Sequence, residues 1–359
     1  MEAREDSLAA KAATRRFGIV LSAAAALLAA SSPMQAHADD PFFKGKTITL
    51  TTSQGVGGVH DLLARVVARY IGNYLDGYPR IIVQNMPGGG DVTATAYMYA
   101  IAPRDGTAIA IISNSIPLHQ VIDDRGQRYD AREFNWLGSP SAENDAVFAW
   151  RSAGVATVDD LRQKQLVLGG TGPGSNLVII PTVMNNVLGT KFKIVSGYKS
   201  SNELFLAMDR GEIQARDGSY PGIIAAYPSW IKQNRIVFLA QDGLERDKAM
   251  PHVPLLIELA NSDEERKVLE LISSPAALGE PYLAPPGVPA ERVAMLRRAF
   301  AETMHDKAFL ADAAKLGIDV NFIDGATVAK IVDTTIATAP EIVEKAKAAM
   351  NPAGGSSKI

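Results

Sequence analysis

The sequence predicts an α/β protein with two doubly wound, mostly parallel sheets flanked by helices. Strand-like and helix-like segments alternate from residue 47 onward, as in parallel sheets with helical crossovers. A strand that breaks into glycines and then opens a helix occurs twice, at 47–62 and at 166–176. Because these two loops are more than a hundred residues apart, we expect two lobes that hold one small anion between them.

The N-terminal segment has the layout of a secretory signal peptide. Basic residues precede an apolar run over 17–30, and Ala36-His37-Ala38 forms an A-x-A cleavage site. The apolar run is shorter than the roughly 20 residues that span a bilayer. We therefore expect residues 1–38 to be a cleaved signal peptide and the mature protein to be exported.

The composition argues against several classes of protein. The chain has 359 residues, no cysteine and a net charge of −3 with mixed signs. A disulfide framework and a thiolate metal site are therefore excluded, and no basic surface for nucleic acid is expected. The histidines are dispersed without metal-ligand spacing, so we expect neither a metal nor a cofactor.

The first expected lobe reads as βαβαβ. Strands are predicted at 47–52, 80–84 and 108–113, with helices at 62–75 and 94–102 between them. The third strand is apolar without polar alternation, as expected for a strand buried on both faces. Parallel sheets of this kind bind ligands at the carboxyl ends of their strands.

The pattern restarts after about residue 142. Further strands are predicted at 146–150, 166–169, 191–196, 213–216 and 236–240, with helices near 176–188, 201–210 and 221–233. From about residue 270 the chain is expected to return, with helices at 290–304, 307–316 and 325–349. The first lobe would then comprise 39–142 and 270–350 and the second 143–269. Two crossing strands near 142 and 270 would form the hinge, and the Gly- and Ser-rich tail 351–359 would be disordered.

The two glycine loops have the properties of anion sites. The first turn of a helix leaves backbone N–H groups unpaired, and the helix dipole makes that end partly positive. Glycines let a ligand approach those N–H groups closely. The loops therefore predict recognition of a negatively charged group.

Motifs of common enzymes are not found in the sequence. It has no G-x-S-x-G elbow, H-E-x-x-H pair or G-x-x-x-x-G-K-[ST] loop. The glycines at 170–174 lack the third glycine of a dinucleotide loop. We expect no enzyme, and a secreted hydrolase with an unrecognised site is left as an alternative.

An ordered set of short segments resembles one known family. The segments are QGVGGVHDLLAR at 54–65, VQNMPGGG at 83–90, APRDGT at 102–107, GTGPGS at 170–175, GYKS at 197–200, GEI at 211–213 and APPGVP at 284–289. In order and spacing they resemble the Bug (TctC) receptors, the substrate-binding proteins of tripartite tricarboxylate transporters.

The resemblance implies a two-lobed periplasmic-binding-protein fold of type II-like architecture. Such a receptor would sit in the periplasm as a monomer, close on a small carboxylate-bearing ligand and deliver it to a permease of two integral membrane subunits. An extracytoplasmic sensor for a membrane kinase would share the same binding physics and is the other alternative. The ligand itself is left open among organic acids, amino acids and neutral analogues.

The resemblance also implies the ligand-binding residues. They are Gly57, Gly58 and Asp61 in the first loop, Ser113, Asn114 and Ser115 after the third strand, and Thr171, Gly174, Ser175, Tyr198, Lys199 and Ser200 in the second lobe. Each has a structural alternative: the glycines can serve a tight turn, Asp61 and Ser175 can cap helices, Lys199 can be solvated, and Tyr198 can belong to the core.

Arg216 departs from the family pattern. In Ile213-Gln214-Ala215-Arg216-Asp217-Gly218 it stands where the family usually has an apolar or aromatic residue. A guanidinium at a strand end can pair bidentately with a ligand carboxylate, or it can be held by Asp217 or Asp61. In a regular strand, Asp217 should point to the opposite face. Arg216 is therefore a candidate ligand anchor.

Overall fold

The computed structural model describes residues 41–57, 59–88, 91–123, 128–142, 144–172, 175–198 and 200–351. The predicted signal peptide and the tail after Asn351 lie outside these residues, as do Gly58, Gly174 and Lys199. No helix in the described ranges combines the length and the apolar character needed to cross a membrane.

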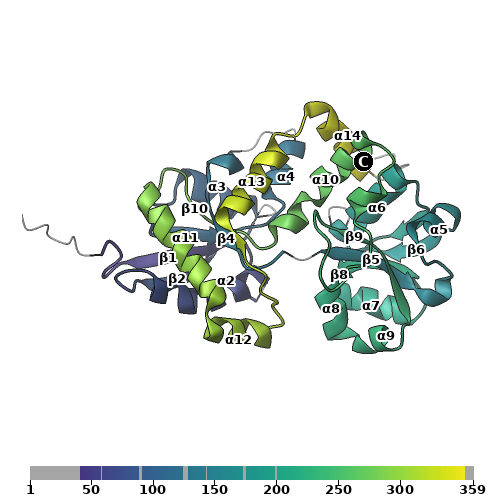
Figure 1. The fold of residues 1–359 in the computed structure, drawn as a ribbon, viewed down its shortest axis with the longest axis horizontal. Coiled ribbons are helices and arrows are strands. Elements are labelled where there is room, and N and C mark those ends of the chain that lie inside the picture. Colours follow the sequence, from purple (N-terminus) through teal and green to yellow (C-terminus); the bar gives the residue numbers. More distant parts are fainter. Residues whose placement is uncertain are drawn as a thin grey trace, which may run out of the picture. The chain divides into compact units, whose positions relative to one another are not determined.

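The first sheet and the helices packed on it form what we call the first lobe (Figure 1). Its strands run in the order β11-β4-β10-β3-β1-β2. They are β1 (Thr47–Thr52), β2 (Arg80–Asn85), β3 (Ala108–Ile111), β4 (Asn135–Ser139), β10 (Tyr282–Ala284) and β11 (Ile323–Asp324). Its helices are α2 (Val59–Tyr70), α3 (Val92–Ala100), α4 (Ile116–Ile122), α11 (Ala290–His305), α12 (Lys307–Lys315) and α13 (Gly325–Ile336), with short 3-10 turns at Ile71–Tyr74 and Ala131–Glu133.

The second sheet defines the second lobe, with strand order β7-β6-β8-β5-β9. Its strands are β5 (Asp145–Trp150), β6 (Leu166–Gly169), β7 (Phe192–Val195), β8 (Ala215–Ser219) and β9 (Ile236–Asp242). The helices are α5 (Val158–Gln163), α6 (Asn176–Leu188), α7 (Ser201–Asp209), α8 (Tyr220–Ala226), α9 (Pro228–Lys232), α10 (Asp263–Leu278) and α14 (Pro340–Met350), with 3-10 turns at Arg151–Ala153 and Leu256–Leu259.

Both sheets are mixed, whereas the sequence predicted mostly parallel ones. In each lobe only two strand pairs are parallel, β1 with β2 and β3, and β6 with β7 and β8. The antiparallel pairs involve β10 and β11 in the first sheet and β5 in the second. Of these strands, β5 and β10 enter a sheet directly from the other lobe, so their direction is set by the crossing and not by a βαβ unit.

The two crossings lie at the carboxyl ends of the strands. Asp145, the first residue of β5, pairs with the last residues of β8 and β9, Ser219 and Asp242. Tyr282, the first residue of β10, pairs with Ile111 at the end of β3. Loops that follow β1, β3, β6 and β8 therefore emerge at the same edge of their sheet as the crossings, which is where ligands bind in open α/β sheets.

The C-terminal third differs from the prediction in its last helix. The single helix expected at 325–349 is two helices, because Pro340 cannot continue α13 and instead begins α14. Apolar residues of α14 and of α10 belong to the core of the second lobe, among them Ile342, Val343 and Leu269. The chain returns to the first sheet after the end of α10 at Leu278.

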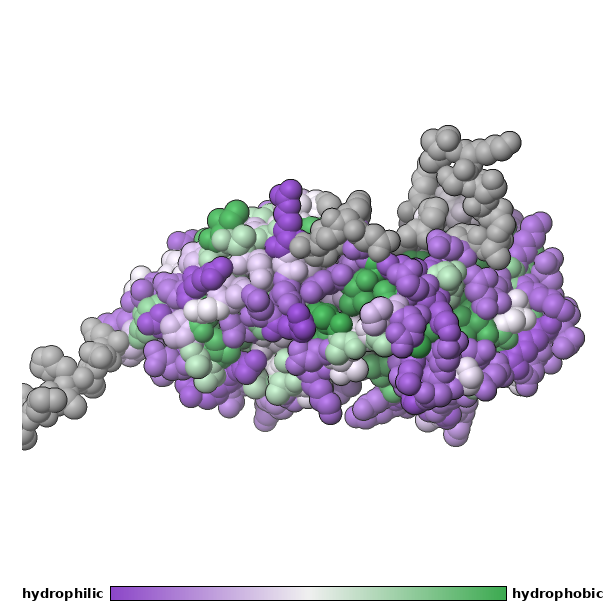
Figure 2. Space-filling model, turned by 90° about the horizontal axis from the view of Figure 1, so that it is seen from above, coloured by the Kyte–Doolittle hydropathy of each residue, from purple (hydrophilic) through white to green (hydrophobic). Residues whose placement is uncertain are grey.

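An aromatic cluster anchors the second-lobe helices under the candidate site. The ring of Trp230 lies 4.4 Å from the rings of both Trp150 and Tyr227 and 5.7 Å from Phe205 on α7. Such contacts stabilise beyond simple area burial and fix the position of α7. The surface over these cores is mostly hydrophilic on the face drawn in Figure 2, with scattered apolar groups.

Candidate functional site

Asp61 organises the first loop from inside. The residue is 2% exposed, and its carboxylate accepts hydrogen bonds from the Gly57 N–H (2.9 Å), Asn85 Nδ2 (2.8 Å) and Arg65 Nε (3.1 Å). Hydrogen bonding from Arg65 above all lowers the pKa of Asp61 to about 2. Gly57 has φ +85°, a conformation that favours glycine. Gly57 and Asp61 thus form a tight turn that is held by a carboxylate in the first turn of α2.

Asn85 completes this network, although its side chain was not among the predicted site residues. Its Nδ2 donates to the Gln54 carbonyl (2.9 Å) as well as to Asp61, and its Oδ1 accepts from Arg65 Nη2 (3.1 Å). The residue ends β2, the parallel neighbour of β1. The available signal was a polar residue at the end of a β-branched strand, just before a Pro-Gly loop.

His60 connects the first loop to a distant segment. Its Nδ1 lies 3.1 Å from Ser53 Oγ, its Nε2 lies 2.6 Å from Glu280 Oε2, and its backbone N–H donates to Gln54 Oε1 (3.2 Å). Serine, histidine and a carboxylate are also the residue types of a hydrolase triad. Ser53 is only 1% exposed, however, so its hydroxyl is closed to a substrate carbonyl.

Ser113, Asn114 and Ser115 form the turn between β3 and α4. All three are partly exposed. The Ser115 N–H donates to Ser113 Oγ (3.2 Å), and Ser115 Oγ donates to Asn114 Oδ1 (3.3 Å). Because the Ser113 hydroxyl accepts the first of these bonds, its own proton can be offered to another acceptor.

In the second loop, Thr171 and Ser175 share a hydrogen bond of 2.8 Å between their hydroxyls, and Ser175 Oγ also accepts from the Leu177 N–H (3.1 Å). Ser175 is therefore the N-cap of α6. Two hydroxyl groups sharing one bond have two protons between them, so one proton is left whichever way the shared bond runs. That remaining O–H can donate to an anion.

The loop before α7 lies beside the second glycine loop. The Gly197 N–H donates to the Thr171 carbonyl (2.6 Å) and the Tyr198 N–H donates to the Gly170 carbonyl (3.4 Å), so Tyr198 lies beside the second glycine loop. Tyr198 is half-buried against the second-lobe core, and Ser200 is exposed and caps α7 by accepting from the Glu203 N–H (3.3 Å).

Arg216 is 2% exposed and lies beneath the start of α7. Its guanidinium is 4.1 Å from the Phe205 ring centroid, its Nη1 donates to the Ser201 carbonyl (3.1 Å) and its Nε donates to the Asp217 carbonyl (3.0 Å). Burial lowers the pKa of Arg216 to about 10. Its Nη2 also donates to Ser201 Oγ (3.4 Å). The partners are thus two backbone carbonyls, one hydroxyl and a ring, and neither the Asp217 nor the Asp61 carboxylate accepts one of these hydrogen bonds.

Three aspartates gather at the carboxyl end of the second sheet. Asp145 and Asp242 are register partners, and Val147, two residues after Asp145 on the same face, pairs with Asp217. Burial raises the pKa of Asp145 to about 6 and of Asp242 to about 7, and that of Asp217 well above its usual range. Among the described residues, no group of three or more His, Cys, Asp or Glu is arranged to hold a metal ion.

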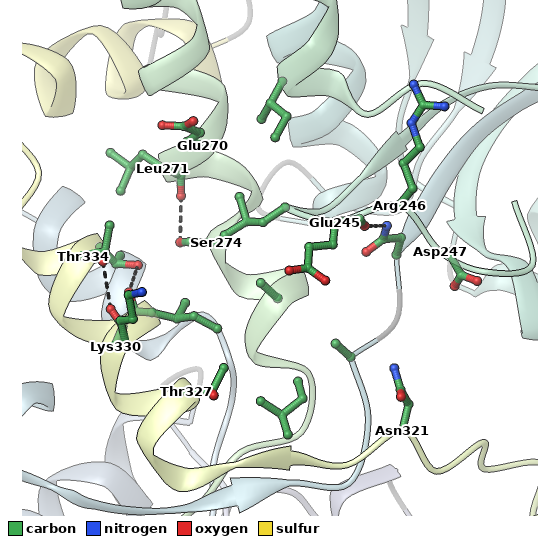
Figure 3. Close-up of a pocket in the computed structure, with 18 of the residues that line it drawn as sticks. Glu245, Arg246, Asp247, Glu270, Leu271, Ser274, Asn321, Thr327, Lys330 and Thr334 are labelled. Atoms are coloured by element: carbon green, nitrogen blue, oxygen red, sulfur yellow. Dashed lines mark hydrogen bonds between the residues drawn. The ribbon is translucent and has the colours of Figure 1, made fainter. Parts of the chain in front are cut away.

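A separate cleft of about 1740 Å³ is lined by α10, α13 and the segment 244–249 (Figure 3). Polar side chains from these elements, including Glu270, Ser274, Thr327 and Glu245, line it. None of the candidate ligand residues in the described ranges does so, and its volume exceeds the roughly 300–1,000 Å³ of small-molecule sites. The candidate site is therefore the set of loops at the strand ends.

Comparisons with known proteins identify the family of the chain. The sequence model described as "Tripartite tricarboxylate transporter family receptor" matches residues 63–348. A Cupriavidus necator protein described as "UPF0065 protein in gbd 5'region" is 24% identical over 91% of this chain and 94% of its own length.

Two solved structures show the same fold. A ligand-free TctC solute binding protein from Polaromonas is 19% identical, with a TM-score of 0.66 over 84% of this chain and 99% of its own. Rpa4515 of R. palustris, solved with adipate, is 20% identical, with a TM-score of 0.55 over 84% of this chain and 97% of its own. At these identities the likeness concerns the fold.

Proposed function

The chain belongs to the tripartite tricarboxylate transporter receptor family, whose members are periplasmic solute-binding receptors, and we propose that it captures a small carboxylate-bearing metabolite between its two lobes. The observation that carries the proposal is the position of the hydroxyl-rich loops. Ser113–Ser115 and Thr171–Ser175 follow β3 and β6 at the edges where the chain crosses between lobes, and each offers O–H protons to an acceptor.

Capture of this kind changes no covalent bond of the ligand. Hydroxyl and backbone N–H donors would replace the water around the carboxylate, and hydrogen bonds to a charged acceptor are the stronger ones. Closure of the lobes around the hinge would exclude the remaining solvent. The adipate in the related Rpa4515 structure supports a carboxylate as the recognised group.

We propose further that the protein is exported through cleavage after residue 38, acts as a monomer and hands its ligand to a permease of two integral membrane subunits. Co-purification from membranes with these subunits tests this step. Recovery of a membrane kinase in their place would assign the protein to sensing.

A thermal-shift screen of the mature protein, residues 39–359, tests ligand capture. The screen would contain mono-, di- and tricarboxylates with the matching neutral diamides, for example adipate against adipamide. A ligand at 100 times its Kd adds roughly 2.7 kcal/mol to the free energy of unfolding, so a specific acid should raise Tm clearly and its diamide should not.

Solution scattering of the free and the ligand-saturated protein tests closure. We expect a smaller radius of gyration with ligand. Stabilisation by the diamide equal to that by the acid would refute carboxylate recognition, and an unchanged radius with a tight ligand would refute capture by closure.

A further inference from the structure

Glu280 sits where the chain returns from the second lobe to the first. Its backbone N–H donates to Ser139 Oγ (2.9 Å) and to the Ser141 carbonyl (3.3 Å), in the outgoing segment after β4. The preceding Gly279 has φ +60°, and a Cβ there would lie 1.5 Å from the Ser141 carbonyl oxygen. The two crossing segments are therefore in direct backbone contact, and Glu280 is part of that contact.

His60 reaches this junction from the first ligand loop. It is 5% exposed, and it spans from Ser53, just after β1, to the Glu280 carboxylate 2.6 Å from its Nε2. The Ser53 hydroxyl can accept from Nδ1 or donate to it, and Nε2 lies at ion-pair distance from the Glu280 carboxylate. The His60 side chain thus joins the loop before α2 to Glu280, whose backbone contacts the outgoing crossing.

We propose that His60 is a positioning residue that fixes the first ligand loop to the crossing segments, so that ligand affinity depends on its contact with Glu280. The inference rests on the proposed function, because it assumes that the first loop borders the ligand. In this mechanism His60 does not contact the ligand. It acts by holding residues 53–61 in one conformation relative to the hinge.

Hydrogen exchange of the free protein tests the mechanical part without any ligand. We expect peptide 53–61 to exchange at least about tenfold faster in His60→Leu, which keeps the bulk but loses both bonds, and in Glu280→Gln, which leaves the histidine in place. His60→Gln, whose amide can still donate to Glu280, should recover much of the protection. His252→Gln, at an exposed site, is the control and should change nothing in 53–61.

Affinity for the acid found in the screen tests the functional part. His60→Leu and Glu280→Gln should each raise Kd about tenfold, and the double variant should raise it no further, since both remove one contact. The NMR signal of the His60 ring, assigned from its loss in His60→Gln, should shift on ligand binding in the wild type and less in Glu280→Gln.

The outcomes separate the two proposals. Unchanged exchange of 53–61 in both variants overturns the positioning role, whatever the protein binds. Additive effects on Kd, or an unchanged Kd with a working ligand, also overturn it. Failure of the wild type to bind any acid refutes the proposed function instead, and faster exchange in the variants would still support the link between loop and hinge.

Discussion

Asp61 in the first lobe and Asp242 in the second are both buried carboxylates near the carboxyl edge of a sheet, 2% and 5% exposed. Asp61 receives hydrogen bonds from Arg65, Asn85 and the Gly57 backbone. Asp242 faces Ser273 on α10 and the like charge of Asp145. The first environment lowers the pKa to about 2, and the second raises it to about 7. Hydrogen-bond donors around the carboxyl group, and not burial alone, therefore decide whether the ionised or the protonated form of each aspartate is stabilised.

The two sites have opposite consequences for stability against pH. Asp61 has a folded pKa below its unfolded value, so its contribution is present above about pH 4 and is lost as the pH falls toward 2. Asp242 has a raised folded pKa, so its contribution is present below about pH 4 and is lost as the pH rises through about 7. Asp61 therefore favours neutral pH, and Asp242 favours mild acid.

Loss of the Asp61 charge should have the largest effect. In Asp61→Asn, Arg65 and the Gly57 N–H lose a charged acceptor, and we expect a loss of about 2 kcal/mol in the free energy of unfolding at pH 7 and at least a tenfold rise in Kd. Urea unfolding and calorimetric titration measure the two. Asp76→Asn, at an exposed ion pair with 3.9 Å between its charged atoms, should stay within about 0.5 kcal/mol. Equal behaviour of the two variants would contradict the organising role of Asp61.

The difference between the lobes also shows what a sequence can reveal. The glycine loops after β1 and β6 follow from local signals, a β-branched run, glycines and an amphipathic helix, and their positions were predicted. Strand alternation likewise predicts that the Asp217 side chain turns away from Arg216, and the hydrogen bond that Arg216 makes to this residue is to its backbone carbonyl. Such features are encoded within a few residues.

The features that were missed depend on contacts distant in sequence. The directions of β5 and β10 are set by the crossings. Hydrophobic periodicity and strand propensity therefore do not reveal them. Glu280 meets His60 only through the return of the chain after α10. The packing of α10 and α14 on the second-lobe core is another such contact, because α14 is far from the rest of that core in sequence.

Arg216 gives the next largest expected effect. Arg216→Met should weaken binding of the acid about tenfold and Arg216→Lys less, because lysine keeps the charge but loses the planar fork. Direct contact with the ligand predicts that a neutral analogue binds all three proteins equally. Positioning through Ser201 predicts that acid and analogue weaken together. Equal Kd values in all three proteins would remove Arg216 from the site.

Asp242→Asn tests the second lobe's preference for acid. The amide cannot ionise, so the variant should be at least about 1 kcal/mol more stable than the wild type at pH 8 and similar to it near pH 4. Chemical unfolding from pH 4 to 8 should show a flatter profile in the variant. A profile parallel to that of the wild type would mean that Asp242 titrates normally.

Ser175→Ala is expected to have the smallest effect and separates capping from ligand binding. The Leu177 N–H loses its acceptor, which costs about 1 kcal/mol of stability, the usual value of an N-cap. Ser262→Ala is the matched control, because Ser262 caps α10 in the same way by accepting from the Glu265 N–H (3.1 Å). If the O–H left over from the Thr171–Ser175 pair binds the carboxylate, Ser175→Ala should also weaken the ligand by roughly 0.5–3 kcal/mol, whereas Ser262→Ala should leave Kd unchanged. Loss of stability alone in both variants would show that Ser175 is a helix cap and that the anion is held elsewhere.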